Sequence, residues 1–159
     1  MTTAAADPTI RAVVAGEKKV LVVEDERDLR LALASRLRDR GLIVDEAGGG
    51  QAAMDLMAVE HYAVILVDLL MPQPDGFALL EALSSGQLKK PSVVLVTTGA
   101  DPTVLDRLDP DRIHGVVRKP FDADELADLV NACAEIRSRS NVEMMALAMM
   151  STAALFDLL

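Results

Sequence analysis

Apolar and polar positions follow two alternating spacings between residues 19 and 139. Short runs of β-branched and aliphatic residues are typical of strands that a parallel sheet buries on both faces. Five such runs predict strands at 20–23, 42–44, 63–67, 92–96 and 115–117.

Between these runs, apolar residues recur three and four positions apart, as on a helix with one buried face. The first predicted helix stops at Gly41, a residue common just past helix ends. Its apolar face consists of Leu29, Ala32, Leu33 and Leu37. Two further helices are predicted at about 50–60 and at 76–84. A weaker helix at 103–108 is cut short by Pro110. The last helix begins after Asp122 as N-cap, and its apolar residues are Leu126, Leu129, Val130 and Cys133.

Five strands that alternate with five helices predict a doubly wound parallel α/β sheet. In the flavodoxin-like strand order 2-1-3-4-5, ligands bind beyond the carboxyl ends of strands one and three, where the strand order reverses. We therefore predict a five-stranded α/β sandwich of this order with an extra C-terminal helix, and a functional crevice where these two strands end.

Composition and charge narrow the class of protein. The 159 residues are 51% hydrophobic and carry a formal net charge of −9, which argues against binding to the phosphate backbone of nucleic acids. A single cysteine, Cys133, excludes an internal disulfide and suits the reducing cytoplasm, where we expect the protein. Residues 1–18 lack the apolar run of a secretory signal and are expected to form a flexible arm. We expect no membrane span.

Three acidic residues directly follow two of the predicted strands. Glu24 and Asp25 follow the first strand, and Asp68 follows the third. Like charges at close range stay ionised only when a cation or a proton intervenes. Carboxylate oxygens suit a hard divalent cation, and Mg²⁺ is favoured because it needs few protein ligands.

Two further strand ends add a hydroxyl and an ammonium group. Thr97 closes the fourth strand and Lys119 closes the fifth. A fixed ammonium beside metal-bound carboxylates suits an incoming dianion, because the two cations together neutralise phosphoryl oxygens. We interpret Asp68 as a nucleophile that attacks a phosphoryl group and forms an acyl phosphate, whose oxygens Thr97 and Lys119 hold.

Four motifs, taken together, carry a resemblance to a known family. Residues 19–139 resemble the receiver domain of response regulators, the CheY-like module that accepts phosphate from a histidine kinase in two-component signalling. The motifs are Val22-Val23-Glu24-Asp25-Glu26, Asp68-Leu69-Leu70-Met71-Pro72 with Asp75-Gly76, Val96-Thr97, and Lys119-Pro120-Phe121. Each motif alone is weak, but the ordered set is highly specific.

The resemblance implies a role for each reactive residue. Asp68 is then the phosphoacceptor, Thr97 the switch hydroxyl that moves toward the phosphoryl group, and Lys119 its counter-charge. The family also implies a cis peptide bond between Lys119 and Pro120.

The resemblance further implies how Mg²⁺ is held and which proteins interact. Asp25 and Asp68 would bind the ion directly, Glu24 through water, and Leu70 through its backbone carbonyl. The implied partners are a histidine kinase or phosphotransfer protein and a downstream protein target. No enzyme activity is implied beyond the protein's own phosphorylation and dephosphorylation.

The chain departs from the family pattern at three places. Val116 stands where many receivers carry an aromatic ring that moves with the switch threonine. Thr98 stands where alanine is frequent, and a larger side chain narrows access to the phosphoryl group. Asp109-Pro110 interrupts the fourth helix. Together these residues predict an atypical output surface beside an intact phosphorylation site.

Three other features carry no predicted chemistry. Gly48-Gly49-Gly50 is not a phosphate-binding loop because no Lys-Ser/Thr pair follows it. We interpret it as a flexible entry to the second helix, away from the crevice. His61 and His114 also lie off the crevice and are interpreted as structural or solvated.

Residues 140–159 predict an apolar C-terminal helix. Ser140-Asn141-Val142-Glu143 has the spacing of a capping box, although one continuous helix from Asp122 fits equally well. Its two apolar stripes contain Val142, Met145, Met149, Phe156 and Leu159, and Met144, Ala148, Leu155 and Leu158. Such a helix must bury both stripes, either on its own domain, in a homodimer or against a partner.

The sequence fits three functions. The leading one is a receiver that takes a phosphoryl group on Asp68 and signals through protein contacts. The alternative is a receiver-like interaction module that switches without phosphate, or a receiver fragment of a longer regulator whose linker helix is truncated. A metal-dependent phosphohydrolase is disfavoured, because Leu70 stands where a second acid is needed.

Overall fold

The five apolar runs form one parallel sheet. The computed structural model describes residues 18–99 and 101–136. Its strands are β1 (Lys19–Val23), β2 (Ile43–Ala47), β3 (Val64–Asp68), β4 (Val93–Thr98) and β5 (Gly115–Arg118). They lie in the order β2-β1-β3-β4-β5. The predicted flavodoxin-like strand order is confirmed, so the first and third strands are neighbours.

The three central strands are buried almost throughout. Apart from Lys19 at the start of β1, every residue of β1, β3 and β4 is buried, as expected for strands covered on both faces. The parallel register places Val23 beside Val67 and Asp68 beside Thr97. The carboxyl ends of the central strands therefore meet at one edge of the sheet.

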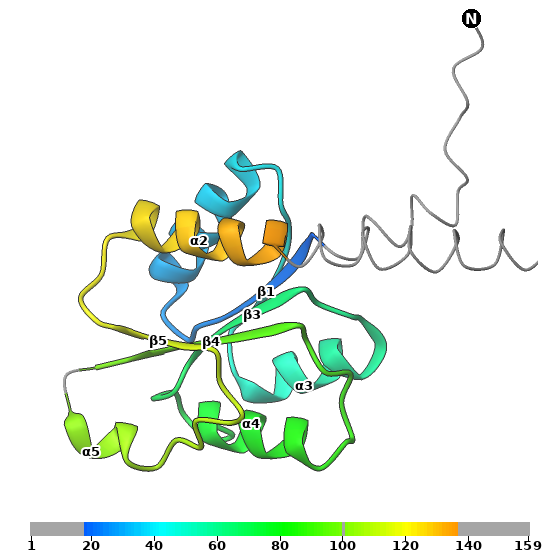
Figure 1. The fold of residues 1–159 in the computed structure, drawn as a ribbon, viewed down its shortest axis with the longest axis vertical. Coiled ribbons are helices and arrows are strands. Elements are labelled where there is room, and N and C mark those ends of the chain that lie inside the picture. Colours follow the sequence, from blue (N-terminus) through cyan, green and yellow to red (C-terminus); the bar gives the residue numbers. More distant parts are fainter. Residues whose placement is uncertain (1–17, 100, 137–159) are drawn as a thin grey trace, which may run out of the picture.

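Helices cover both faces of this sheet (Figure 1). One face carries α2 (Arg27–Asp39) and a helix over residues 123–136, and the other carries α3 (Gly50–Val59), α4 (Gly76–Ser84) and α5 (Pro102–Leu105). Each layer has its own apolar core, because successive side chains of a strand point to opposite faces. The helical residues of the first core are Leu33, Ala34, Leu37, Leu126, Ala127, Val130 and Ala134, and those of the second include Ala53, Met57, Leu79, Leu80, Leu83 and Val104.

Short-range signals set the helix ends. Gly41 has a φ of 82° after α2, a left-handed conformation that favours glycine. Asp75 caps α4 by accepting the Ala78 N–H at 3.0 Å. Asp122 caps the helix over 123–136, as predicted, by accepting the N–H groups of the residues two and three positions later at 2.8 and 3.0 Å.

The structure corrects several boundaries. β2 runs to Ala47 instead of ending at 44, because an edge strand tolerates the half-buried Asp45 and Glu46. α5 is a single turn over Pro102–Leu105 and does not reach 108. Leu129, expected on a buried helix face, is 44% exposed.

Two predicted segments fall largely or wholly outside the described residues. These are the N-terminal arm over 1–18, of which residue 18 alone is described, and the apolar helix over 140–159. Among the described residues, no helix has the length and apolar character needed to cross a membrane.

Candidate functional site

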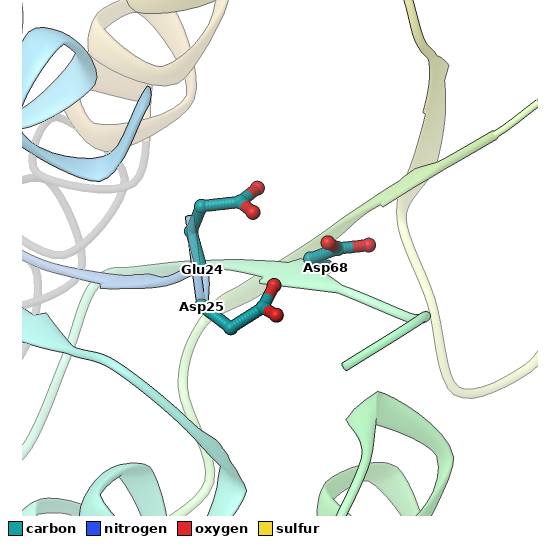
Figure 2. A group of neighbouring side chains, drawn as sticks. All are labelled: Glu24, Asp25 and Asp68. Carbon is teal, nitrogen blue, oxygen red and sulfur yellow. The ribbon is translucent and has the colours of Figure 1, made fainter. Parts of the chain in front are cut away.

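Three carboxylates converge beyond the ends of β1 and β3. Figure 2 shows Glu24 and Asp25 leaving the end of β1 and Asp68 at the end of β3, with the carboxylate of Asp25 turned toward that of Asp68. One oxygen of each residue lies within 4.8 Å of the others. Glu24 and Asp68 are buried and Asp25 is exposed, so the cluster opens to solvent on the Asp25 side.

Lys119 joins the two buried acids. Its Nζ lies 3.0 Å from Glu24 Oε2 and 2.9 Å from Asp68 Oδ2. Burial alone lowers the pKa of Lys119, but the hydrogen bonds and negative charges of Asp68 and Glu24 outweigh burial and raise it. The ammonium group is therefore protonated at neutral pH.

The acidic side chains remain undercompensated. Burial raises the pKa of Glu24; the hydrogen bond from Lys119 opposes this shift, and the charge of Asp68 adds to it. Glu24, Asp25 and Asp68 bring three carboxylates together here, and Lys119 bridges two of them. Hard oxygen donors with excess negative charge and an opening to solvent fit Mg²⁺, which binds through a few carboxylates and keeps several waters.

Backbone groups fix the orientation of the acids. The Leu70 N–H donates to Asp68 Oδ1 at 3.1 Å, and the Glu26 N–H donates to Glu24 Oε1 at 3.3 Å. Arg30 donates from Nη1 to the Glu24 carbonyl at 2.7 Å. The sequence analysis missed Arg30, because no spacing rule separates it from the other arginines of α2.

The two threonines at the end of β4 differ in their surroundings. Thr97 is the register partner of Asp68, is 2% exposed, and its carbonyl accepts the Leu69 N–H at 3.0 Å. Thr98 is fully buried, and its Oγ1 has no hydrogen-bond partner within the described part of the chain. The Thr98 carbonyl accepts the Lys119 N–H at 2.7 Å, which ties the lysine segment to β4.

Three more predicted features can be located. The side chain of Leu70 is half exposed beside the acids. The Lys119–Pro120 peptide bond is cis, as the resemblance implied. Val116 is 39% exposed on β5, and its side chain is aliphatic.

The histidines lie outside the cluster. His114 Nδ1 accepts the Val94 N–H at 3.0 Å, next to the start of β5, so this side chain completes the hydrogen bonding of β4. His61 is exposed between α3 and β3.

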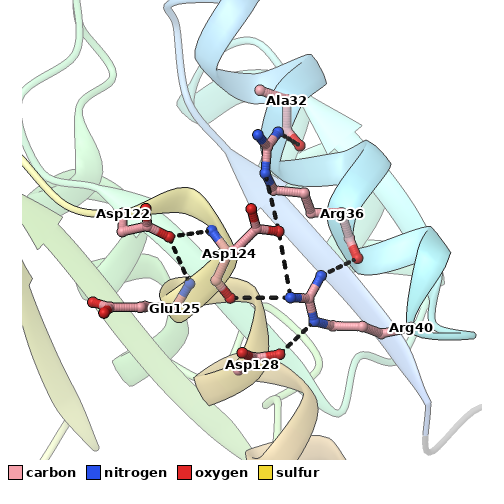
Figure 3. A network of polar contacts seen from close by, with 7 residues as sticks. All are labelled: Ala32, Arg36, Arg40, Asp122, Asp124, Glu125 and Asp128. Atoms are coloured by element: carbon pink, nitrogen blue, oxygen red, sulfur yellow. Dashed lines mark hydrogen bonds and ion pairs between the residues drawn. The ribbon is translucent and has the colours of Figure 1, made fainter.

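The helix that follows Lys119 is held against α2 by an ionic network (Figure 3). Arg40 Nε lies 2.7 Å from Asp128 Oδ1, and Arg40 Nη2 lies 3.4 Å from Asp124 Oδ1. Arg36 Nε lies 3.3 Å from the same Asp124 oxygen. The network joins the two helices and shares no residue with the acidic cluster.

Comparison with known proteins identifies the family. Residues 20–131 match the response regulator receiver domain. The chain belongs to this family. Receiver domains act as modules of two-component signalling, and the chain shares their fold and acidic pocket.

Curated relatives include both short and long regulators. The chain is 31% identical over 120 residues to the transcriptional regulatory protein PdtaR of Mycobacterium tuberculosis, covering 75% of this chain and 58% of PdtaR. It is 29% identical over 120 residues to the regulatory protein AtoC of Escherichia coli, covering 76% of this chain and 26% of AtoC. The chain thus spans between about a quarter and three fifths of these relatives.

Smaller relatives and solved structures match almost end to end. The probable chemotaxis protein CheY of Rhizobium etli is 27% identical over 121 residues, covering 75% of this chain and 94% of that protein. The Francisella response regulator 1452 receiver domain superposes with a TM-score of 0.64 at 26% identity, covering 76% of this chain and 98% of that structure. The family match over residues 20–131 spans nearly all of the described sheet and its helices.

Proposed function

We propose that this receiver accepts a phosphoryl group on Asp68 in a Mg²⁺-dependent reaction and signals through protein contacts. The observation that carries the proposal is the bridge from Lys119 to Asp68 and Glu24 inside a cluster of three carboxylates. Such a bridge leaves one fixed cation beside a nucleophile, where an incoming dianion needs charge compensation. The donor would be a phosphohistidine on a kinase or phosphotransfer protein.

The acids and one backbone carbonyl would hold the ion. Asp25 and Asp68 would bind Mg²⁺ directly, Glu24 through water, and Leu70 through its carbonyl oxygen. Bound Mg²⁺ would supply charge neutralisation for the phosphoryl oxygens. Lys119 is already cationic, so its side chain needs no additional proton to face the phosphoryl oxygens.

In the transfer itself, a carboxylate oxygen of Asp68 attacks the phosphorus atom. The bond from phosphorus to the donor imidazole nitrogen breaks, and that nitrogen keeps the electron pair. The Leu70 N–H and Lys119 Nζ each hold one oxygen of Asp68, at 3.1 and 2.9 Å, so its carboxylate is oriented before the donor arrives. Thr97, beside Asp68 in the register, would donate its hydroxyl to the transferred group, and water would later hydrolyse the acyl phosphate.

The test replaces the nucleophile. Asp68→Asn keeps the size of the side chain but removes the attacking oxygen anion, so we expect complete loss of phosphoryl uptake from acetyl phosphate or a phosphorylated kinase. Intact-protein mass spectrometry measures the uptake. Asp55→Asn on the exposed face of α3 is the matched control and should be labelled like the wild type. Equal labelling of Asp68→Asn and the wild type would refute the assignment.

A second candidate function has its own support. α5 is a single turn, Val116 offers no aromatic ring, and the buried Thr98 side chain lies next to Thr97. These features favour an interaction module that keeps the receiver fold but switches without phosphate. Beryllofluoride with Mg²⁺ mimics the phosphorylated state, so its binding supports the first function and its failure to bind supports the second.

The proposal also includes the limits of the receiver and of the segment that follows it. We take residues 19–139 as the receiver and residues 140–159 as an apolar helix that serves in dimerisation, in docking or as the linker of a longer regulator. The chain covers only part of PdtaR and AtoC, and this partial coverage supports including the linker among the three roles.

A further inference from the structure

The start of α3 lies in unusually close contact with the loop that follows Asp68. Gly50, the first residue of α3, is buried. A Cβ atom at Gly50 would lie 2.2 Å from the carbonyl oxygen of Pro74, 3.0 Å from its carbonyl carbon and 3.2 Å from its Cγ. The neighbouring Gly49 has nothing within 4 Å of the equivalent position. Gly50 therefore packs closely against this loop, a contact that the predicted flexible helix entry did not include.

Backbone conformation does not explain glycine at position 50. Gly41 and Gly86 are the described glycines with positive φ, and Gly50 is not among them. Alanine at an ordinary helical position favours the helix over glycine by up to about 1 kcal/mol. A side chain at position 50 would thus clash with Pro74, and this clash favours glycine there.

The loop has little freedom to absorb such a violation. At its far end, a Cβ atom on Gly76 would lie 2.5 Å from the Asp68 carbonyl oxygen and 2.7 Å from Leu69 Cα. The Gly76 N–H also donates to the Leu69 carbonyl at 3.3 Å. Because Gly76 packs this closely on Asp68 and Leu69, we expect a displacement at Pro74 to be passed on to the segment that carries Leu70.

We infer that Gly50 is a positioning residue, which lets α3 brace this loop and so sets the placement of the Asp68 and Leu70 oxygen atoms toward Mg²⁺. The inference rests on the function proposed above. A carbon atom at 2.2 Å must be displaced by about 1 Å to reach ordinary contact. Mg²⁺ demands near-ideal octahedral geometry, and loss of a supporting contact around a metal typically costs about 10–100-fold in affinity.

The experiment compares Gly50→Ala with the matched control Gly49→Ala. Mg²⁺ is titrated into ¹⁵N-labelled protein, and the shifts of the Asp68 and Leu70 amide resonances give the dissociation constant. Thermal unfolding is followed in parallel by circular dichroism. We expect Gly50→Ala to weaken Mg²⁺ binding by about tenfold or more, and Gly49→Ala to stay within about twofold of the wild type. Unchanged Mg²⁺ affinity in folded Gly50→Ala, with or without a lower melting temperature, overturns the inference.

If Gly50→Ala does not fold, the same titration of the wild-type protein tests the inference. Mg²⁺ should then shift the Gly50 amide resonance together with those of Asp68 and Leu70, and leave that of Gly86 unchanged. A Gly50 resonance that stays fixed while the loop resonances move overturns the brace but leaves the proposed function intact. A wild-type protein that binds no Mg²⁺ overturns both.

Discussion

Lys19 on β1 and Lys119 just after β5 bridge pairs of carboxylates at nearly the same distances, yet we assign a reaction to Lys119 alone. Lys19, at the start of β1, lies 3.0 Å from Asp45 Oδ2 and 2.9 Å from Glu60 Oε2. The Tyr62 hydroxyl donates to the same Asp45 oxygen at 2.7 Å. These acids are 31% and 47% exposed, so water shares in their solvation.

The charges around Lys119, beyond the other end of β1, are far less balanced. Lys119 meets Glu24 and Asp68 at 3.0 and 2.9 Å, but these side chains are 3% and 5% exposed. Asp25 adds a third negative charge to the cluster, whereas Tyr62 adds a neutral donor to the first one. Burial together with unmatched charge therefore separates the two clusters.

The direction of the pKa shifts reflects the same difference. Burial raises the pKa of Glu24, and Lys119 does not fully compensate. Burial also acts to raise the pKa of Asp45, but the hydrogen bonds from Tyr62 and Lys19 outweigh it and lower that pKa. The ionised form of Glu24 is thus disfavoured, whereas the ionised form of Asp45 is favoured. A binding site for a cation is marked by uncompensated charge and not by the geometry of an ion pair.

The largest expected effect tests the two lysines directly. Lys119→Ala removes the fixed charge beside the attacked phosphoryl group, so we expect the rate of phosphoryl uptake to fall by about 100-fold or more. Lys19→Ala breaks an equally short bridge and should leave the rate within about twofold. Labelling with acetyl phosphate, quenched at set times and followed by mass spectrometry, measures the uptake rates of both variants. Equal losses in the two variants would show that the charge difference does not determine function.

Sequence reasoning located the acidic cluster because parallel strands leave their carboxyl ends at one edge of a sheet. That rule connects Glu24, Asp68 and Lys119 without any knowledge of side-chain contacts. The alternation of strands and helices predicts the parallel α/β class, and the order 2-1-3-4-5 comes from the flavodoxin-like folds of that class. The extra length of β2 was missed, because its polar residues Asp45 and Glu46 break the apolar pattern on an exposed edge.

Contacts between distant segments were beyond the reach of spacing rules. Arg30 of α2 contacts the Glu24 carbonyl, and Gly50 at the start of α3 approaches Pro74 in the loop after β3. The short α5 is another example, because a pattern of apolar residues continued to Leu108 while the chain left the helix after Leu105. These features depend on tertiary packing, which local propensity does not encode.

A smaller effect is expected from Asp45 and depends on pH. The pKa of Asp45 is lowered from its ordinary value of 3.8 in the folded state, so its contribution to stability is present above that value and is lost as the pH falls through the folded pKa. Asp45→Asn keeps an acceptor for Tyr62 but loses the charge, and should cost about 1 kcal/mol of unfolding free energy at neutral pH. The gap from the wild type should close as the pH drops below 3.8.

Urea unfolding at several pH values checks this expectation, with Asp55→Asn as the control for losing an exposed carboxylate on α3. A gap that persists unchanged at the lowest pH where both proteins fold would contradict the assigned pKa direction. Phosphoryl uptake at neutral pH should be the same in wild type and Asp45→Asn, because Lys19 and its partners lie away from the crevice.

The smallest effect is expected at the network between α2 and the helix over 123–136 (Figure 3). Arg40 bridges Asp124 and Asp128, whose side chains are 62% and 71% exposed, so water and salt screen these pairs. Arg40→Ala should lower the melting temperature slightly, and most of the difference should vanish in about 1 M salt. Arg27→Ala, at the exposed start of α2, controls for the lost charge.

Arg40→Ala also tests whether the position of the helix over 123–136 determines the position of Lys119, which precedes that helix by a few residues. The bridge of Lys119 to Glu24 and Asp68 and the Lys119 N–H bond to the Thr98 carbonyl hold the lysine independently of Arg40. Mg²⁺ binding and phosphoryl uptake should therefore stay within about twofold of the wild type. A loss of about tenfold in uptake, measured while the variant is fully folded, would mean that the outer ionic network, and not the local bridge, holds Lys119 in place.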